Sequence, residues 1–176
     1  VKADKIKTRI ESELKQVRYE DPLLFEEFST KIKETIAEYD KSRDEDKYLA
    51  TMEAMADDFN NGRLTRDYPA SIANDSDTKA FYGSIITLVR AKTDIDVTDE
   101  LEEVIATNSK KIRQTISDIA KRDWKHNEVV HKQMHRALDD CLFDMFDEIG
   151  YTIDKTNIDV LDLIIDEIMK VAVARY

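Results

Sequence analysis

Apolar residues recur at three- and four-residue steps along almost the whole chain. This is the period of an amphipathic α-helix. The sequence shows no sustained alternation of apolar and polar residues, which would indicate a half-buried strand. With three Gly and two Pro among 176 residues, the chain also has few helix breakers. The pattern therefore predicts an all-α protein, a helical bundle of about seven helices.

Start and stop signals delimit these helices. The Asp21-Pro22 pair is typical of an N-cap followed by a first-turn proline. Asn61-Gly62 is typical of a helix C-terminus, and Asn127 is a further candidate cap. The helices are expected over about residues 6–17, 22–39, 44–61, 77–90, 99–124, 127–150 and 157–171.

Breakers suggest a division into two helical subdomains. Pro69 and the cluster Asn74-Asp75-Ser76 interrupt the periodic pattern. We therefore expect an N-terminal helical part over residues 1–62, a linker over 63–76, and a C-terminal bundle over 77–176. The chain begins with Val1 instead of Met, so we expect it to begin inside a longer polypeptide or after processing.

Composition indicates the compartment. A single Cys excludes an internal disulfide framework and fits a reducing environment. No apolar run approaches the ~20 residues that a transmembrane helix requires. The net charge of −11 argues against nucleic acid as a direct partner. We expect a soluble, cytoplasmic protein that is monomeric as an isolated domain.

Residues 110–136 form a basic band in this acidic chain, with eight Lys and Arg against three Asp and Glu, a net charge of +5. The only Trp, Trp124, lies within it, and aromatic residues beside Arg are common anchors of protein interfaces. The band would suit an acidic protein surface or a phosphate backbone. Alternatively, Trp124 packs in the core and the cations only solubilise the helices. The candidate partner-binding residues are Lys121, Arg122, Trp124, Lys125, His131, Lys132 and Arg136.

The band overlaps the most distinctive segment of the chain, Asp123 to Asp144, which reads DWKHNEVVHKQMHRALDDCLFD. This segment resembles a signature near the C-terminus of the restriction (R) subunits of type I restriction–modification enzymes. In that family a Trp-containing turn precedes a helix with the same order of basic, Met, acidic-pair and Leu-Phe-Asp positions. The similarity spans most of the chain, and its specific part lies between about Tyr68 and Tyr176. It includes the terminal Arg175-Tyr176, and weaker similarity occurs at Tyr68-Pro69 and Ala80-Phe81-Tyr82-Gly83.

R subunits combine an endonuclease domain, two ATP-driven translocase domains and a helical C-terminal region. That last region is associated with assembly onto the methyltransferase core of modification and specificity subunits. The resemblance implies that this chain is such a region, a non-catalytic assembly domain that meets DNA through the parent complex. It implies ATP and Mg²⁺ for the parent subunit, an ATP-dependent deoxyribonuclease, and no cofactor in this segment. The alternative is a helical module that contacts DNA or a nucleotide directly during translocation.

Other chemistry finds little support in the sequence. His131 and His135 have the four-residue spacing of two metal ligands, but Cys141 would lie on the opposite, buried side of the same helix. Asp140 and Asp144 share a helical face, which favours a solvated acidic surface over a nuclease site. There is no phosphate-binding loop of the GxxxxGK[ST] type. We therefore expect no catalytic residue and no metal site, and neither DNA cleavage nor ATP hydrolysis by this chain alone.

Overall fold

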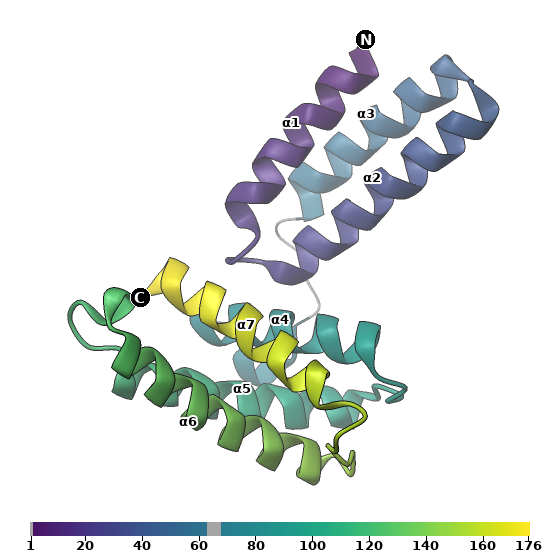
Figure 1. Cartoon of the computed structure of the whole chain (residues 1–176). Helices are drawn as coiled ribbons and strands as arrows, with labels where there is room; N and C mark the ends of the chain where they lie inside the picture. The colour runs from purple at the N-terminus through teal and green to yellow at the C-terminus, as the bar shows by residue number, and fades with distance from the viewer. Residues whose placement is uncertain (1, 63–67) are drawn as a thin grey trace. The chain divides into compact units, whose positions relative to one another are not determined.

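The computed structural model describes residues 2–62 and 68–176, and it confirms an all-α protein. Within those residues there are seven α-helices, two short 3₁₀ helices and no strand (Figure 1). The α-helices are α1 (Lys2–Val17), α2 (Pro22–Ser42), α3 (Glu45–Gly62), α4 (Ser76–Lys92), α5 (Asp99–Ile119), α6 (Glu128–Glu148) and α7 (Ile158–Arg175). The 3₁₀ helices are η1 (Ala70–Ile72) and η2 (Trp124–His126). Among the described residues, no helix combines the length and the apolar character needed to cross a membrane.

The chain divides into two compact units, residues 1–67 and residues 68–176. Residues 63–67 of the expected linker lie outside the described residues. Its second half, residues 68–76, belongs to the second unit. Ile72 is buried there, and the Ser71 hydroxyl donates a 2.8 Å hydrogen bond to Glu103 on α5. Asp75, expected as a breaker, caps α4 by accepting a 3.0 Å hydrogen bond from the Thr78 N–H.

Helices α1, α2 and α3 form the first unit, and each packs against the other two (Figure 1). In its core, Phe28 and Phe59 meet edge to face with ring centroids 5.2 Å apart, an arrangement that aromatic quadrupoles favour. The expected start of α2 is confirmed: the Asp21 carboxylate accepts a 3.1 Å hydrogen bond from the Leu24 N–H, and Pro22 occupies the first turn.

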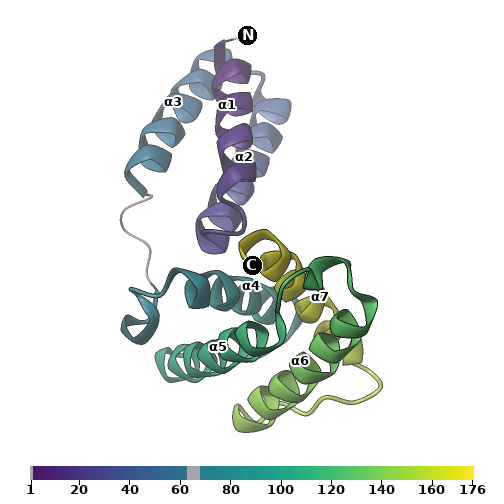
Figure 2. The same ribbon diagram turned by 90° about the vertical axis from the view of Figure 1, so that its left-hand side faces the viewer.

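Helices α4, α5, α6 and α7 form the second unit, together with η1 and η2. Helix α4 packs against both α5 and α7, while α6 packs against α5 and α7 (Figure 2). Every residue of α4 from 80 to 86 is buried, as expected for a helix segment that is apolar around most of its circumference. The apolar stripes expected on α6 and α7 are also buried. The buried members are Met134, Leu138, Leu142 and Met145 on α6, and Val160, Leu161, Ile164, Ile165, Ile168 and Val171 on α7. Val130, which was also expected in the α6 stripe, is half-buried.

The structure corrects the expected end of α5. This helix was predicted to run to about Trp124, but it ends at Ile119. Asp123 then adopts a left-handed conformation with φ of 60°, which Asp tolerates better than most residues. The chain turns there into η2. Asn127 caps α6 as expected, since its side chain accepts hydrogen bonds of 3.0 and 3.3 Å from two N–H groups of the first turn.

Candidate docking surface

The α5–α6 loop and the first half of α6 carry the residues singled out from the sequence. The Arg122 side chain is 96% exposed, and its Nε lies 3.9 Å from the carboxylate of the neighbouring Asp123. Lys125 is half-buried within η2. We call the exposed cations the cationic surface; they are Lys121, Arg122, Lys132 and Arg136. The chain thus presents these four charges to solvent on a short loop and on the helix that follows it.

The structure does not gather the whole basic band. Arg113 is half-buried and lies near the start of α4, with its Nε 3.7 Å from Asp75 Oδ1 and 4.0 Å from Asp77 Oδ2. Lys110 and Lys111 are exposed on α5, about two and a half turns before its end. In the first part of the band, Arg113 therefore lies beside two carboxylates near the start of α4, while Lys110 and Lys111 lie on the exposed surface of α5.

Trp124 is buried, with 4% of its surface exposed. Of the alternatives that the sequence left open, the interior position is the one observed. The indole ring lies beside the imidazole of His131, with ring centroids 5.4 Å apart and planes at 47°. Because Trp124 belongs to η2 and His131 to α6, this packing holds the loop against the helix. The role of Trp124 in the structure is to position the loop.

Two polar atoms within this contact lack a hydrogen-bond partner among the described residues. They are the Trp124 Nε1 and the His131 Nε2, both shielded from solvent. Nearly all buried polar atoms in proteins are paired, and leaving one unpaired costs about 1–3 kcal/mol. Among the described residues, apolar packing of the indole ring is therefore the contact that holds the loop against α6.

Helix α6 presents an exposed face along its whole length. Val129 is 75% exposed and Phe143 is 42% exposed. Their spacing of fourteen residues places them on the same side of the helix, opposite the buried stripe. Sequence reasoning missed both, although this spacing was a usable signal. The exposed residues of this α6 face are Val129, Lys132, Gln133, Arg136, Asp140, Phe143, Asp144 and Asp147. Its first half is basic and its second half is acidic.

A second polar cluster joins the start of α4 to the end of α7. The Arg175 Nε donates a 2.7 Å hydrogen bond to Asp77 Oδ1, and a terminal guanidinium nitrogen donates one of 3.0 Å to the Ser76 hydroxyl. The Tyr176 hydroxyl donates to Asp77 Oδ2 at 3.4 Å. The Tyr176 ring stacks on Phe81, with centroids 6.5 Å apart. Segments nearly a hundred residues apart in the chain thus meet in one place.

Burial, hydrogen bonds and charges in this cluster shift two pKa values. Burial alone would raise the pKa of Asp75, but hydrogen bonds from Thr78 and the positive charge of Arg113 hold it below its ordinary value. Burial raises the pKa of the Tyr176 hydroxyl, and the Asp77 carboxylate raises it further. The cluster therefore favours an ionised Asp75 and a neutral Tyr176, the protonation states that its hydrogen bonds require.

The other candidate ligands are dispersed. The described residues contain no group of three His, Cys, Asp or Glu side chains that could hold a metal ion. His131 faces Trp124, and the Cys141 sulfur lies 3.6 Å from the Thr115 hydroxyl. Asp140 and Asp144 point to solvent on α6. These side chains form part of the packing and the surface of the second unit.

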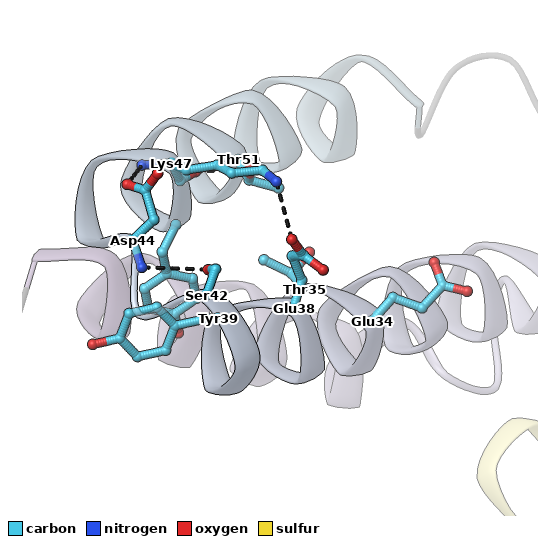
Figure 3. A pocket seen from close by; sticks show the side chains of 9 residues that line it. Glu34, Thr35, Glu38, Tyr39, Ser42, Asp44, Lys47 and Thr51 are labelled. Carbon is cyan, nitrogen blue, oxygen red and sulfur yellow. Dashed lines mark hydrogen bonds and ion pairs between the residues drawn. The ribbon is translucent and has the colours of Figure 1, made fainter.

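A pocket of about 230 Å³, lined by polar residue types, lies between α2 and α3 in the first unit (Figure 3). The Lys47 Nζ donates a 3.1 Å hydrogen bond to Glu38 Oε1, and the Lys47 backbone N–H donates one of 2.9 Å to Asp44 Oδ1. Tyr39 and Tyr48 stack with centroids 4.5 Å apart. The Lys47–Glu38 contact and the tyrosine stack fasten α2 to α3, while the bond to Asp44 caps the start of α3. The pocket is explained by the packing of the two helices around their turn.

No protein-family model, no curated protein and no solved structure matches this chain. Its function is therefore inferred from the residues and their geometry.

Proposed function

We propose that this chain is the C-terminal helical domain of the R subunit of a type I restriction–modification enzyme. In this proposal its second unit docks onto the methyltransferase core of modification and specificity subunits. The part that resembles the family most specifically, from about Tyr68 to Tyr176, coincides with one compact unit. Segments that carry the resemblance also meet within it. Phe81 stacks on Tyr176, and the Tyr68 ring lies 6.0 Å from that of Tyr82.

The observation that carries the docking proposal is the cationic surface, in which Lys121 and Arg122 lie on a loop that the buried Trp124 fastens to α6. A loop fixed before binding loses less conformational entropy when a partner binds. Val129, on the first turn of α6, adds an apolar side chain that is 75% exposed. The cations would accelerate association with an acidic partner, while Val129 would contribute buried contact area.

Direct binding of DNA by the same surface is the alternative. The exposed face of α6 argues against it, because Asp140, Asp144 and Asp147 occupy the second half of that face. A phosphate backbone along α6 would meet these carboxylates, and the net charge of −11 adds general repulsion. A protein partner, in contrast, can present charges of both signs. The geometry therefore favours docking onto protein.

Charge reversal tests the proposal. Lys121→Glu with Arg122→Glu should weaken binding of the chain to the methyltransferase core of the same restriction system by at least tenfold, or about 1.4 kcal/mol. The wild-type affinity should fall as salt rises, because exposed charges are screened. Lys92→Glu with Lys155→Glu is the matched control, since both lysines are exposed in the second unit outside the cationic surface. Analytical ultracentrifugation measures the binding.

A parallel measurement separates protein docking from DNA binding. Gel shifts with a duplex should show no tight binding of DNA by the isolated chain. Val129→Ser should lower the affinity for the methyltransferase core without changing the net charge. If the reversals at Lys121 and Arg122 leave assembly intact but abolish tight DNA binding, the docking proposal is wrong and the DNA alternative replaces it.

A further inference from the structure

An open groove of about 610 Å³ lies between α1 and α2 in the first unit. Its floor is apolar and consists of the buried Leu14 and Ile32 with the half-buried Phe25 and Ile36. The α2 residues of the floor follow helical spacing, and the small Ser29 occupies the intervening position on the same face. The large apolar side chains therefore form the floor of the groove. The small side chain of Ser29 leaves open space over that floor.

The rim of the groove is basic. Lys15 on α1 and Lys33 on α2 are exposed and line it from the two helices. At the end near the α1–α2 turn, the Arg18 guanidinium lies 5.2 Å from the centroid of the Tyr19 ring and 5.3 Å from that of Phe25. Such cation–π contacts orient a guanidinium group while it keeps its charge. Cations thus line the groove from both helices and at its end near the α1–α2 turn.

The charge of these cations is opposite in sign to that of the chain. Among the described residues that line the groove, three are cationic and Glu11 alone is acidic, whereas the chain as a whole carries a net charge of −11. An apolar floor between basic edges is complementary to a ligand with an apolar stripe flanked by carboxylates. An amphipathic helix rich in Asp and Glu has this pattern.

We propose that the groove binds an acidic amphipathic helix of a partner protein. The stretch of α2 from Phe25 to Ile36 spans about 16 Å, the length of three helical turns. An occupant of that length would place apolar residues at positions i, i+3 or i+4, and i+7 on the floor, a recurring mode of recognition. Its carboxylates would then lie beside Lys15, Lys33 and Arg18. This site lies in the first unit and is independent of the cationic surface on the second.

The test uses the whole chain and two labelled helical peptides, each about three to four turns long. Both carry Leu at the spacing above; one has Glu at the flanking positions and the other has Lys. Fluorescence anisotropy should show that the acidic peptide binds at least tenfold more tightly than the basic one. Lys15→Glu with Lys33→Glu should weaken binding of the acidic peptide at least tenfold. Lys5→Glu with Lys41→Glu, exposed positions on the same two helices, should leave it unchanged.

Ser29→Trp tests the groove without changing its charge, because an indole ring would fill the space above the floor. It should abolish peptide binding while circular dichroism still shows a folded helical chain. Equal binding of the two peptides, or tight binding by the folded Ser29→Trp variant, would overturn the proposal. Self-association of the wild-type chain in sedimentation would also overturn the proposal if the Lys15→Glu with Lys33→Glu variant no longer self-associates. The occupant of the groove would then be a second copy of the chain. Tighter binding of laurate than of the acidic peptide would assign the groove to a small amphipathic acid instead.

Discussion

Arg175 and Asp77 are joined by a 2.7 Å hydrogen bond between the guanidinium Nε and the carboxylate Oδ1, although 98 residues separate them in the chain. The Arg175 side chain is 15% exposed and that of Asp77 is 33% exposed, so solvent screens this pair only in part. Hydrogen bonds between ionised groups are stronger than neutral ones. The pair fastens the last turn of α7 to the first turn of α4.

Arg175→Ala should therefore lower the free energy of unfolding by about 1.5–3 kcal/mol, the usual range for a hydrogen bond to a charged group. Lys170→Ala provides the control, because the Lys170–Glu167 pair lies on the same helix and Lys170 is 53% exposed. Loss of the Lys170–Glu167 pair should lower the free energy of unfolding by less than about 1 kcal/mol. Urea denaturation measures both variants. Equal costs would show that the sheltered position of Arg175 adds nothing.

Substitutions that create cavities in the core of the second unit should lower the free energy of unfolding. Leu138 and Leu161 are 0% and 1% exposed, and replacing either by Ala should lower the free energy of unfolding by about 2–5 kcal/mol. Leu163→Ala, at a position 42% exposed on the same helix as Leu161, should change it by no more than about 0.5 kcal/mol. Denaturant titration followed by circular dichroism gives the comparison. A small cost at both core positions would contradict the packing of α6 and α7.

Trp124 should contribute to stability through its ring more than through its N–H group. Trp124→Ala should lower the free energy of unfolding by about 3–5 kcal/mol, because it empties a buried aromatic site. Trp124→Phe should cost less than about 1.5 kcal/mol, since it keeps a ring and removes the unpaired buried Nε1–H. Thermal unfolding followed by circular dichroism measures both. Equal destabilisation by the two substitutions would indicate that the indole N–H is paired in solution.

Asp75 should contribute to stability in a pH-dependent way. Its folded-state pKa lies below the ordinary value of 3.8, so its contribution is present above about pH 4 and is lost as the pH falls through the folded pKa. Asp75→Asn keeps a good N-cap but removes the charge that faces Arg113. The melting temperature of the variant should be lower than wild type at pH 7, and the gap should narrow below about pH 4. A difference in melting temperature that stays constant with pH would contradict this prediction, because it would show that the charge of Asp75 does not matter. Asp162→Asn, at an exposed position, is the control.

Local sequence signals were enough to predict most of the fold. The Asn127 cap of α6 and the stripe through Met134 and Leu138 are confirmed, because amphipathic periodicity and capping depend on residues close in the chain. The end of α5 was placed too late. No Gly or Pro lies between Asp99 and Trp124, and the turn depends on Asp123 adopting a left-handed conformation that composition does not indicate.

The candidate site was less predictable, because its geometry depends on contacts between distant segments. Arg113 was grouped with the basic band, whereas the fold places it beside Asp75 and Asp77. A lone Trp among cations is equally consistent with a surface anchor and with a buried ring, and only the packing against His131 distinguishes the two. Periodicity reports which face of a helix is apolar, but it does not report which neighbouring segment covers it.

Hydrogen–deuterium exchange of the chain, free and bound to the methyltransferase core of its own restriction system, tests the docking proposal most directly. Binding should slow exchange of the backbone amides in residues 120–136, which include the α5–α6 loop and the first turns of α6. The backbone amides on the exposed side of α7 should exchange at the same rate in the bound and the free chain. Protection confined to other parts of the second unit, with residues 120–136 exchanging as fast as in the free chain, would contradict the assignment of the cationic surface as the docking site.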